Sequence, residues 1–550
     1  MKLAKSLPAV AAAFLSTASA TRNNEQTVLF GGEEAVLAPI NIAIIGAGAA
    51  GASSAYHLAQ FAAETNLPVN ITVFERNEYI GGRSTTVDAY DNPAFPVELG
   101  ASIFVELNSI LVDAVKAFNL STGAFRSANE DIPGASLAVW DGSAFVVQQN
   151  SAGGWWDVAK LLWKYGWAPY TTMKLMRSTT GSFRKMYDAP VFPFASLTQA
   201  VEDVGLLSVV SATGEQYMLE NGIKGDFGHD IVQASTRVNY AQNLKHIHGL
   251  EAMVCMAAEG AMSVEGGNWQ IFYNMIAAAQ ATTLLGTQVT SMERKGDSYT
   301  VSFHSSAEDS EPSVQSALPA GKGDALPMGN ETNITAAFSS QQFDAVILAA
   351  PLQFANLTLP PAPVHTPDEV PYVHLHVTLL TTPHLLSPAF FNLPASAPAP
   401  KVVLTTLPAS EDPQPGPKSC GSPAFFSISL LRPVTNPHNG QPEYLYKIFS
   451  PSAPNATFLA RILGFAPSSP LDLDGDAGIS GRDISWLYRK VWESYPYEYP
   501  RVTFEEICLG EGLWYTSGVE GFISTMETSA LMGRNVARLV VDEWVGRRGG

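Results

Sequence analysis

The chain is poor in cysteine, in basic side chains and in long apolar runs. Its three cysteines, Cys255, Cys420 and Cys508, are too few for a disulfide framework and leave open either one bridge or three lone thiols. Lysine and arginine total 32 against 51 aspartates and glutamates, a net charge of −19 that argues against nucleic-acid binding and against electrostatic attachment to anionic membranes. Beyond the N-terminus, no apolar run is long enough to span a bilayer.

Metal ligands are also scarce in the sequence. It has no CxxC motif and no cluster of cysteine and histidine at metal-ligand spacing. His246 with His248, and His374 with His376, would share a face if each pair lay on a strand. Because neither pair has a third ligand nearby, the sequence predicts no metal site.

The N-terminus, residues 1–20, has the pattern of a secretory signal peptide. Two lysines precede the apolar stretch Leu7–Leu15, and Ala18–Ala20 fits a cleavage site. We therefore expect the mature chain to begin near Thr21 and to enter the secretory pathway, ending in a vacuole or lysosome or outside the cell. The expected N-glycan acceptors are Asn119, Asn330, Asn333, Asn356 and Asn455.

Apolar residues are abundant. They make up 46% of the chain, whereas charged residues make up 15%, so the composition is that of a globular protein with a substantial core. A length of 550 residues fits one large domain or two intertwined ones.

A glycine motif follows the first strand pattern. Ile42–Ile45 is long enough for a buried strand, and a helix is predicted over 50–65. Gly46 and Gly48 lie between the strand and the helix, and Gly51 lies at the start of the helix. The first permits a tight turn, the second lets the backbone approach a pyrophosphate, and the third lets the helix pack on the strand. The free amides of the helix would then face the phosphates.

Glu75 and a second glycine pair favour FAD among the dinucleotides. The next predicted strand, 70–74, ends at Glu75, whose carboxylate can accept hydrogen bonds from both ribose hydroxyls and would repel the 2′-phosphate of NADP. Gly81-Gly82-Arg83 would bring further backbone and a cation to the pyrophosphate, which favours FAD over NAD.

Nucleotide-binding patterns occur in three places, with other segments between them. This layout predicts an α/β fold, a split Rossmann-like FAD-binding domain with an interleaved mixed α+β substrate-binding domain. The predicted FAD-binding segments are 41–105, 256–351 with an exposed insertion over 305–341, and 501–550. The predicted substrate-binding segments are 106–255, helical and aromatic-rich, and 352–500, which is β-rich.

An aromatic-rich stretch stands in the first substrate-binding segment. The sequence predicts a helix over 156–177 within it. As a group the rings suit the lining of a long apolar ligand, although core packing explains any single one. They are Trp155, Trp156, Trp163, Tyr165, Trp167, Tyr170, Phe183, Tyr187, Phe192 and Phe194.

Together these features resemble the prenylcysteine oxidase (prenylcysteine lyase) family, within the FAD-dependent amine-oxidase-like superfamily. The resemblance extends from about Asn41 to Trp544. Beyond the glycine motifs, it rests on Lys160–Trp167, Arg237–Tyr240, Val264–Asn268, Lys447–Ser450 and Met526–Ala530. The chain departs from the family pattern in its long 305–341 insertion and at Ala101, where a glycine is expected.

The resemblance implies FAD as the cofactor and a role for individual residues. The implied contacts are Gly46, Gly48 and Gly51 with the pyrophosphate, Glu75 with the adenosine ribose, Arg83 with the phosphates, Val289 with adenine, and Met526 and Glu527 with the flavin end. The further expected cofactor-binding residues are Ala49, Ala50, Arg76, Gly82, Gly100 and Ala350.

The implied substrate is S-farnesyl- or S-geranylgeranyl-cysteine. A hydride would leave the prenyl carbon next to sulfur for the flavin, water would add, and the adduct would collapse to cysteine and a prenyl aldehyde, with oxygen reduced to hydrogen peroxide. Because the cation is allylic and sulfur-stabilised, no strong base is required, and the catalytic residues stay unassigned. Arg237 and Tyr240 either grip the amino-acid end or form a structural contact, and His246 is a weaker candidate for moving the water's proton.

Three other functions remain open on the sequence. The first is another flavin oxidase of the same superfamily, acting on amines or polyenes. The second is a non-catalytic secreted flavoprotein or lipid carrier. The third is an NAD-linked dehydrogenase, which would purify without the yellow colour of a flavin.

Overall fold

The computed structural model describes residues 38–124, 132–149, 155–305, 339–360, 365–466 and 481–549. The predicted signal peptide, most of the 305–341 insertion, and the predicted glycan acceptors Asn330 and Asn333 lie outside these residues. The acceptors Asn119, Asn356 and Asn455 lie within them and are exposed.

A six-stranded sheet carries the glycine motif. Its central strand β1 (Ile40–Ile45) is apolar and buried, and it pairs in parallel with a strand on each side. In order across the sheet, the strands are β19 (Cys508–Gly510), β20 (Leu513–Tyr515), β13 (Ala345–Leu348), β1, β2 (Val69–Phe74) and β9 (Thr282–Leu284). The sheet thus draws its strands from the beginning, the middle and the end of the chain, which confirms the predicted Rossmann-like α/β class.

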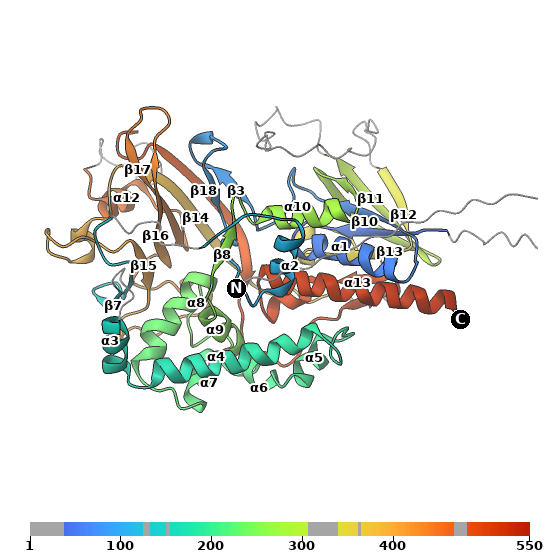
Figure 1. Cartoon of the computed structure of the whole chain (residues 1–550), viewed down its shortest axis with the longest axis horizontal. Helices are drawn as coiled ribbons and strands as arrows, with labels where there is room; N and C mark the ends of the chain where they lie inside the picture. Colours follow the sequence, from blue (N-terminus) through green and yellow to red (C-terminus); the bar gives the residue numbers. More distant parts are fainter. Residues whose placement is uncertain are drawn as a thin grey trace, which may run out of the picture. The chain divides into compact units, whose positions relative to one another are not determined.

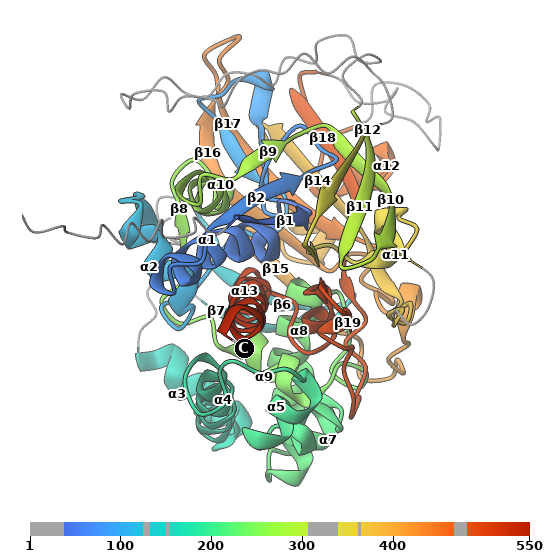
Figure 2. The same cartoon turned by 90° about the vertical axis from the view of Figure 1, so that its right-hand side faces the viewer.

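Two long helices pack against each other beside this sheet. α1 (Ala49–Glu64) follows β1, and α13 (Met526–Gly549) ends the chain; Figures 1 and 2 show them side by side. Their backbones approach so closely that a Cβ added to Gly533 would lie 2.3 Å from the Ala50 carbonyl oxygen. The Ser53 hydroxyl donates to the Ala530 carbonyl at 2.6 Å across the same contact. This crossing fixes the starts of the two helices relative to each other.

A seven-stranded, mainly antiparallel sheet forms the second large layer. In order, its strands are β18 (Trp486–Pro496), β14 (Tyr372–Thr382), β17 (Pro442–Ser450), β16 (Ser427–Thr435), β15 (Val402–Thr405), β6 (Leu137–Trp140) and β7 (Phe145–Gln149). Five of these strands, β14 to β18, lie within 352–500, the segment expected to be β-rich.

Three smaller sheets complete the strands of the described residues. The largest joins β10 (Thr287–Lys295), β11 (Ser298–Ser305) and β12 (Ser339–Phe343), with β10 and β11 paired antiparallel. The two others pair β3 (Thr86–Asp88) with β4 (Pro96–Glu98), and β5 (Thr122–Ala124) with β8 (Met262–Val264).

Helices fill the space between and beside the sheets, and one of them corrects a prediction. The helix expected over 156–177 is two helices, α3 (Trp155–Tyr165) and α4 (Ala168–Arg184), because Gly166 adopts a positive φ of 57° and ends the first. The remaining α-helices are α2 (Ser109–Ala117), α5 (Leu197–Asp203), α6 (Leu207–Val210), α7 (Gly214–Glu220), α8 (Gln233–Tyr240), α9 (Gly249–Met256), α10 (Trp269–Ala278), α11 (Leu352–Ala355) and α12 (Ala456–Leu463).

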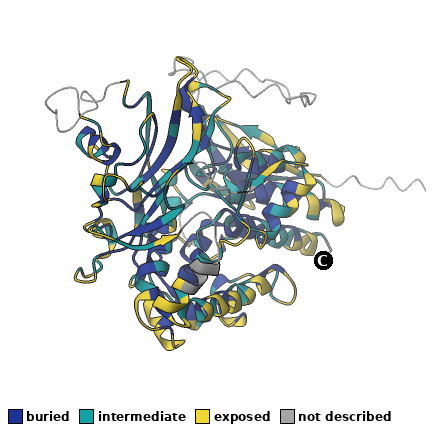
Figure 3. Ribbon diagram, turned by 60° about the vertical axis from the view of Figure 1, so that its left-hand side comes forward, coloured by how far each residue is buried: buried dark blue, intermediate teal, exposed yellow. Residues whose placement is uncertain are grey.

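The residues of the aromatic-rich stretch differ widely in burial. Figure 3 shows buried and exposed residues along the whole ribbon. Tyr165 and Tyr187 are buried in the apolar core, as core packing predicts. Trp163 is 90% exposed and Trp167 is 75% exposed, so these rings do not line an internal site.

The helix crossing leads to a stability test. We expect Gly533→Ala to lower the free energy of unfolding by about 1–3 kcal/mol, because its methyl group has no space against the Ala50 carbonyl. Gly546→Ala, in the same helix with no atom within 4 Å of its Cβ, should leave stability unchanged or raise it by up to about 1 kcal/mol. Chemical denaturation of both variants measures the difference, and equal behaviour would contradict the close crossing.

Candidate functional site

A large cavity lies between the six-stranded and seven-stranded sheets. Its volume is about 1770 Å³, and residues of both sheets line it. Pockets for one small ligand are about 300–1,000 Å³. The cavity therefore has room for a dinucleotide together with a second molecule.

The glycine loop forms one end of this cavity, and each glycine has its own reason to be there. Gly46 has φ of 108°, and a Cβ on Gly51 would lie 1.9 Å from the Gly46 carbonyl oxygen. A Cβ on Gly48 would meet no atom within 4 Å, and Gly48 lines the cavity. Gly81 donates its N–H to the Ala47 carbonyl at 3.0 Å, so the second glycine pair lies against the first. The open space at Gly48 suits a diphosphate.

Glu75 is held at the end of β2, close to this loop. Its Oε2 accepts the Ala47 N–H at 2.9 Å, and its Oε1 accepts two hydrogen bonds from Asn77. The side chain is buried and still lines the cavity. The carboxylate keeps acceptor capacity on Oε2 for a ribose hydroxyl.

Thirteen of the fourteen expected cofactor-binding residues line the cavity. They are Gly46, Gly48, Ala49, Ala50, Glu75, Arg76, Gly82, Arg83, Gly100, Val289, Ala350, Met526 and Glu527. Gly51 does not line it, because its role is the close contact with Gly46.

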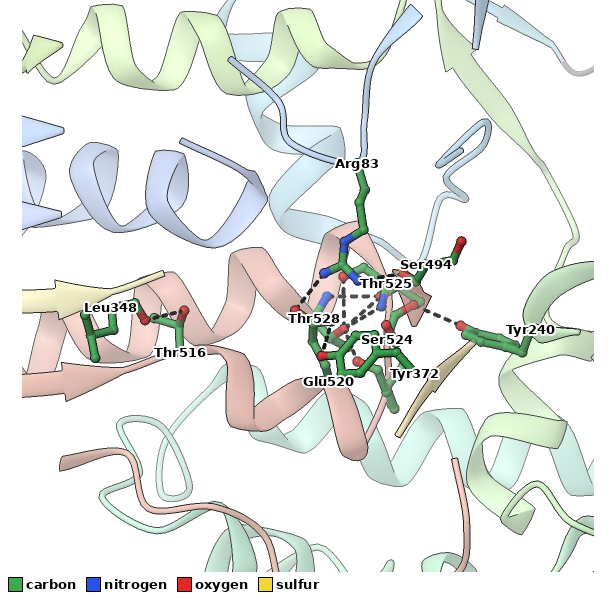
Figure 4. Close-up of polar contacts among 11 residues, drawn as sticks. Arg83, Tyr240, Leu348, Tyr372, Ser494, Thr516, Glu520, Ser524, Thr525 and Thr528 are labelled. Carbon is green, nitrogen blue, oxygen red and sulfur yellow. Dashed lines mark hydrogen bonds and ion pairs between the residues drawn. The ribbon is translucent and has the colours of Figure 1, made fainter. Parts of the chain in front are cut away.

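Arg83 lies at the cavity but is already paired with an acid. Its guanidinium forms an ion pair with Glu520 at 2.7 Å and donates to the Ser494 carbonyl at 2.6 Å, as Figure 4 shows. Tyr372 donates its hydroxyl to the same carboxylate at 3.1 Å. The expected neutralisation of phosphates by Arg83 is thus weakened, because Glu520 offsets its charge.

The start of α13 forms another wall of the cavity. Residues 523–529 line it, and Thr528 closes the turn by donating to the Ile523 carbonyl at 2.6 Å. Glu527 accepts the N–H groups of Ile110 and Leu111, each at 3.0 Å, and so caps α2. Burial raises the pKa of Glu527 to about 7. The Glu527 carboxylate thus joins the start of α13 to the start of α2, and Glu527 also lines the cavity.

Two of the three candidate catalytic residues are corrected by the structure. Arg237 is fully buried and does not line the cavity, because its guanidinium donates to Thr405, Asn243 and the carbonyls of Ser419 and Cys420. His246 contacts the Pro413 carbonyl at 3.0 Å and also lies away from the cavity. Arg237 therefore has a structural role, although the partners of its guanidinium are these residues and not Tyr240, as the sequence suggested.

Tyr240 is the candidate that does line the cavity. Its hydroxyl donates to the Ser524 carbonyl at 3.2 Å, and its ring packs on Tyr495 with centroids 5.1 Å apart. Burial raises the pKa of Tyr240 well above its ordinary value, so the hydroxyl stays protonated. It can donate a hydrogen bond but does not serve as a base.

The histidine pairs do not form metal sites. His248 is buried at the start of α9, where it accepts the Glu251 N–H, so it does not share a strand face with His246. His374 and His376 do lie on β14, with ring centroids 5.5 Å apart. Among the described residues, no group of three or more potential ligands is placed to hold a metal ion.

Sequence reasoning missed a pair of charged residues, the half-buried Glu98 and the buried Lys447. Lys447 donates to the Glu98 carbonyl at 2.7 Å and to the Ser102 hydroxyl at 2.8 Å, and both charged residues line the cavity. Glu98 Oε1 accepts the Asn268 N–H, whereas Oε2 is buried with no hydrogen-bond partner among the described residues. Burial raises the pKa of Glu98 to about 7 and lowers the pKa of Lys447 to about 8. The available signal was a lone lysine in an otherwise apolar strand.

The far wall of the cavity is a largely apolar face of the seven-stranded sheet, which also presents Ser427, Ser429 and Lys447 to the cavity. Its strands β15, β16 and β17 contribute Val402, Leu404, Leu431, Leu445 and Phe449. Phe183, on α4, is the one ring of the predicted aromatic lining that reaches the cavity among those whose side chains the structure describes. An apolar ligand would therefore lie on the sheet, and the expected lining by the aromatic-rich stretch is wrong for Trp163, Trp167 and Tyr170.

The model for the prenylcysteine lyase family matches residues 148–549, and that for an NAD(P)-binding Rossmann-like domain matches residues 44–116. Farnesylcysteine lyase of Arabidopsis thaliana is 26% identical over 525 residues, covering 92% of this chain and 89% of that protein. Prenylcysteine oxidase 1 of Homo sapiens is 25% identical over 536 residues, covering 94% and 91%.

Two solved structures share the fold. Cyclohexylamine oxidase from Brevibacterium oxydans IH-35A superposes with a TM-score of 0.51 at 15% identity, covering 92% of this chain and 100% of that one. A triple mutant of putrescine oxidase also has a TM-score of 0.51, at 11% identity, covering 92% and 99%. Because the family model spans most of its length, the chain belongs to the prenylcysteine lyase family.

Proposed function

We propose that this protein is an FAD-dependent thioether oxidase. It cleaves S-farnesyl- or S-geranylgeranyl-cysteine with oxygen and water to give cysteine, a prenyl aldehyde and hydrogen peroxide. The observation that carries the proposal is one cavity with a glycine-lined nucleotide end, a largely apolar sheet wall and two opposite charges at its lining. The family assignment supports the same reaction class.

FAD fits the nucleotide end of the cavity. The open space at Gly48 would take the pyrophosphate, Glu75 the adenosine ribose, and the start of α13 the electron-rich part of the flavin. When bound, the flavin supplies a two-electron acceptor that oxygen reoxidises. The protein's own contribution is to hold the substrate against it and to keep water out of the buried wall.

The prenyl tail would lie on the apolar wall formed by β15, β16 and β17. Each buried CH₂ contributes about 0.8 kcal/mol to binding. A farnesyl or geranylgeranyl chain therefore supplies much of the affinity without any polar contact. This explains why the wall needs shape and apolarity rather than particular hydrogen bonds.

The amino-acid end of the substrate would lie at Glu98 and Lys447. Lys447 donates two hydrogen bonds to protein oxygens of the described residues, which leaves the third of its N–H donors for the substrate carboxylate. The unpartnered Glu98 Oε2 would accept from the substrate ammonium. The two charges match the carboxylate and the ammonium group of a cysteine. Arg237 and His246, the two other candidates that can carry a positive charge, do not line the cavity.

We place this activity in the secretory pathway. The signal-peptide pattern of residues 1–20 and the three exposed acceptors Asn119, Asn356 and Asn455 support this location.

Cofactor binding is tested at Gly48. We expect Gly48→Ala to fold normally but to bind FAD at least about tenfold more weakly, because its methyl group would take up space meant for the pyrophosphate. Gly181→Ala, on α4 and equally free of close neighbours, is the matched control and should bind FAD as the unmodified protein does. Titration of the apoprotein with FAD and with NAD gives the two dissociation constants. Tighter binding of NAD than of FAD would contradict the flavin assignment.

The reaction is tested by mixing the purified protein with farnesylcysteine without oxygen. We expect the yellow absorbance to bleach, and on readmitting oxygen we expect hydrogen peroxide and a prenyl aldehyde. Bleaching by polyamines or aromatic amines alone would replace this function with an amine oxidase. Binding of farnesylcysteine without any bleaching would indicate a carrier.

The charge pair is tested by its pH dependence. Because the pKa of Glu98 is about 7, kcat/KM should fall as the pH drops below about 7, where this carboxylate gains a proton. Because the pKa of Lys447 is about 8, kcat/KM should also fall above about 8. Glu98→Gln should remove the acidic limb and raise KM about tenfold or more, by loss of a charged hydrogen bond.

Glu493→Gln is the control for this experiment. Glu493 also borders the cavity, but it is partly exposed and pairs with His374, so its replacement should leave the acidic limb in place. An unchanged pH profile in Glu98→Gln would remove the proposed role of the pair while leaving the thioether reaction untouched.

A further inference from the structure

Among the residues whose side chains the structure describes, the most exposed large rings gather where α3 meets α4. Trp163 is 90% exposed, Trp167 75% and Tyr170 55%, and Leu162 and Met173 beside them are 41% and 38% exposed. We call these five residues the α3–α4 corner. Soluble surfaces rarely present two tryptophans so fully to water, and such apolar patches usually mark an interaction site.

The corner is held firmly from below. Tyr165, at the end of α3, is buried and donates its hydroxyl to Asp230 at 2.7 Å. Lys164 donates to the same carboxylate at 2.7 Å, and the rings of Trp167 and Tyr170 contact each other edge to face with centroids 6.2 Å apart. Figure 1 shows α3 and the start of α4 at the edge of the helical layer. The exposed rings therefore stand on an ordered base.

The charge around the corner is opposite to that of the whole chain. Residues 160–185 contain no aspartate or glutamate, in a chain of net charge −19. Their cations are Lys160, Lys164, Lys174, Arg177, Arg184 and Lys185. Asp230 and Glu259, from elsewhere in the fold, pair with Lys164 and Arg177 respectively, so part of this charge is offset. Asp226 also lies near Tyr165, so the excess of cations is a property of the 160–185 stretch itself.

We propose that the α3–α4 corner docks on the surface of an anionic lipid bilayer. Tryptophan and tyrosine prefer the membrane–water interface, and lysine and arginine beside them attract anionic head groups. A lipid bilayer can accept several exposed rings at once, because lipids rearrange around them. A folded protein would have to offer a pocket for each ring. No helix of the described residues is long and apolar enough to cross a membrane, so the contact would be peripheral.

The corner is linked to the cavity by α4. This helix begins beside the corner at Ala168 and contributes Phe183 to the cavity wall near its other end. Its 17 residues span about 25 Å at about 1.5 Å per residue. A docked molecule would thus hold its apolar cavity close to the lipid phase, where prenyl compounds partition. The docking itself does not depend on the proposed reaction.

The test measures co-sedimentation of the purified full chain with vesicles of phosphatidylcholine, with and without phosphatidylserine. We expect binding to the anionic vesicles that weakens as salt is raised. The double variant Trp163→Ser, Trp167→Ser should bind at least about tenfold more weakly. Lys174→Glu should bind about fivefold more weakly, because one attractive charge is reversed.

Matched controls are Val502→Ser and Lys116→Glu. Val502 is 55% exposed and the Lys116 side chain 71% exposed, and both lie away from the corner in the sequence. Equal loss of binding in the controls, or no vesicle binding by the unmodified protein, would overturn the proposal. So would a dimer in vesicle-free buffer that the tryptophan variants convert to monomer, because the corner would then bind a second copy. Thermal unfolding of every variant checks that the fold is intact.

Discussion

The contact between the Gly46 carbonyl and the Cα of Gly51 is the constraint on which the rest of the site depends. Any side chain at Gly51 would collide with that oxygen, since a Cβ would lie 1.9 Å from it. Its absence lets α1 start directly at the end of β1 and point its free amides into the cavity. The crossing of α13 over α1 at Gly533 then brings a second helix start to the same space. Two backbone contacts without side chains thus place two positive helix ends beside one ligand.

Buried charge has two different uses in this molecule. Arg237 is fully buried, and its guanidinium donates hydrogen bonds to protein oxygens. It therefore joins α8 to the loop at Ser419 and Cys420. Lys447 is also buried and Glu98 is half-buried with a buried Oε2, but both line the cavity and keep hydrogen-bonding capacity there. A charged group is therefore structural when protein groups satisfy all of its hydrogen bonds. It can bind a ligand when part of its hydrogen-bonding capacity is left over.

The nucleotide end was predictable because its signals are local. Gly46, Gly48 and Glu75 lie within one strand–turn–helix–strand unit, where spacing alone fixes the geometry. The substrate end was predicted less well, because a run of rings does not say which face of a helix is buried. Gly166 divides the expected helix and turns Trp163 and Trp167 to the outside. The domain boundaries proposed from the sequence stay predictions.

By itself, the sequence determined the Rossmann-like α/β class, the position of the glycine loop and the acid at the end of β2. Only the tertiary structure decided that Glu98 and Lys447 meet, since they are 349 residues apart in the chain. It also decided that an apolar sheet face, rather than the aromatic-rich helices, closes the cavity. The reason is physical: a turn motif is stabilised by neighbouring residues, whereas a cavity wall depends on how distant strands pair and on which side of the sheet their side chains fall.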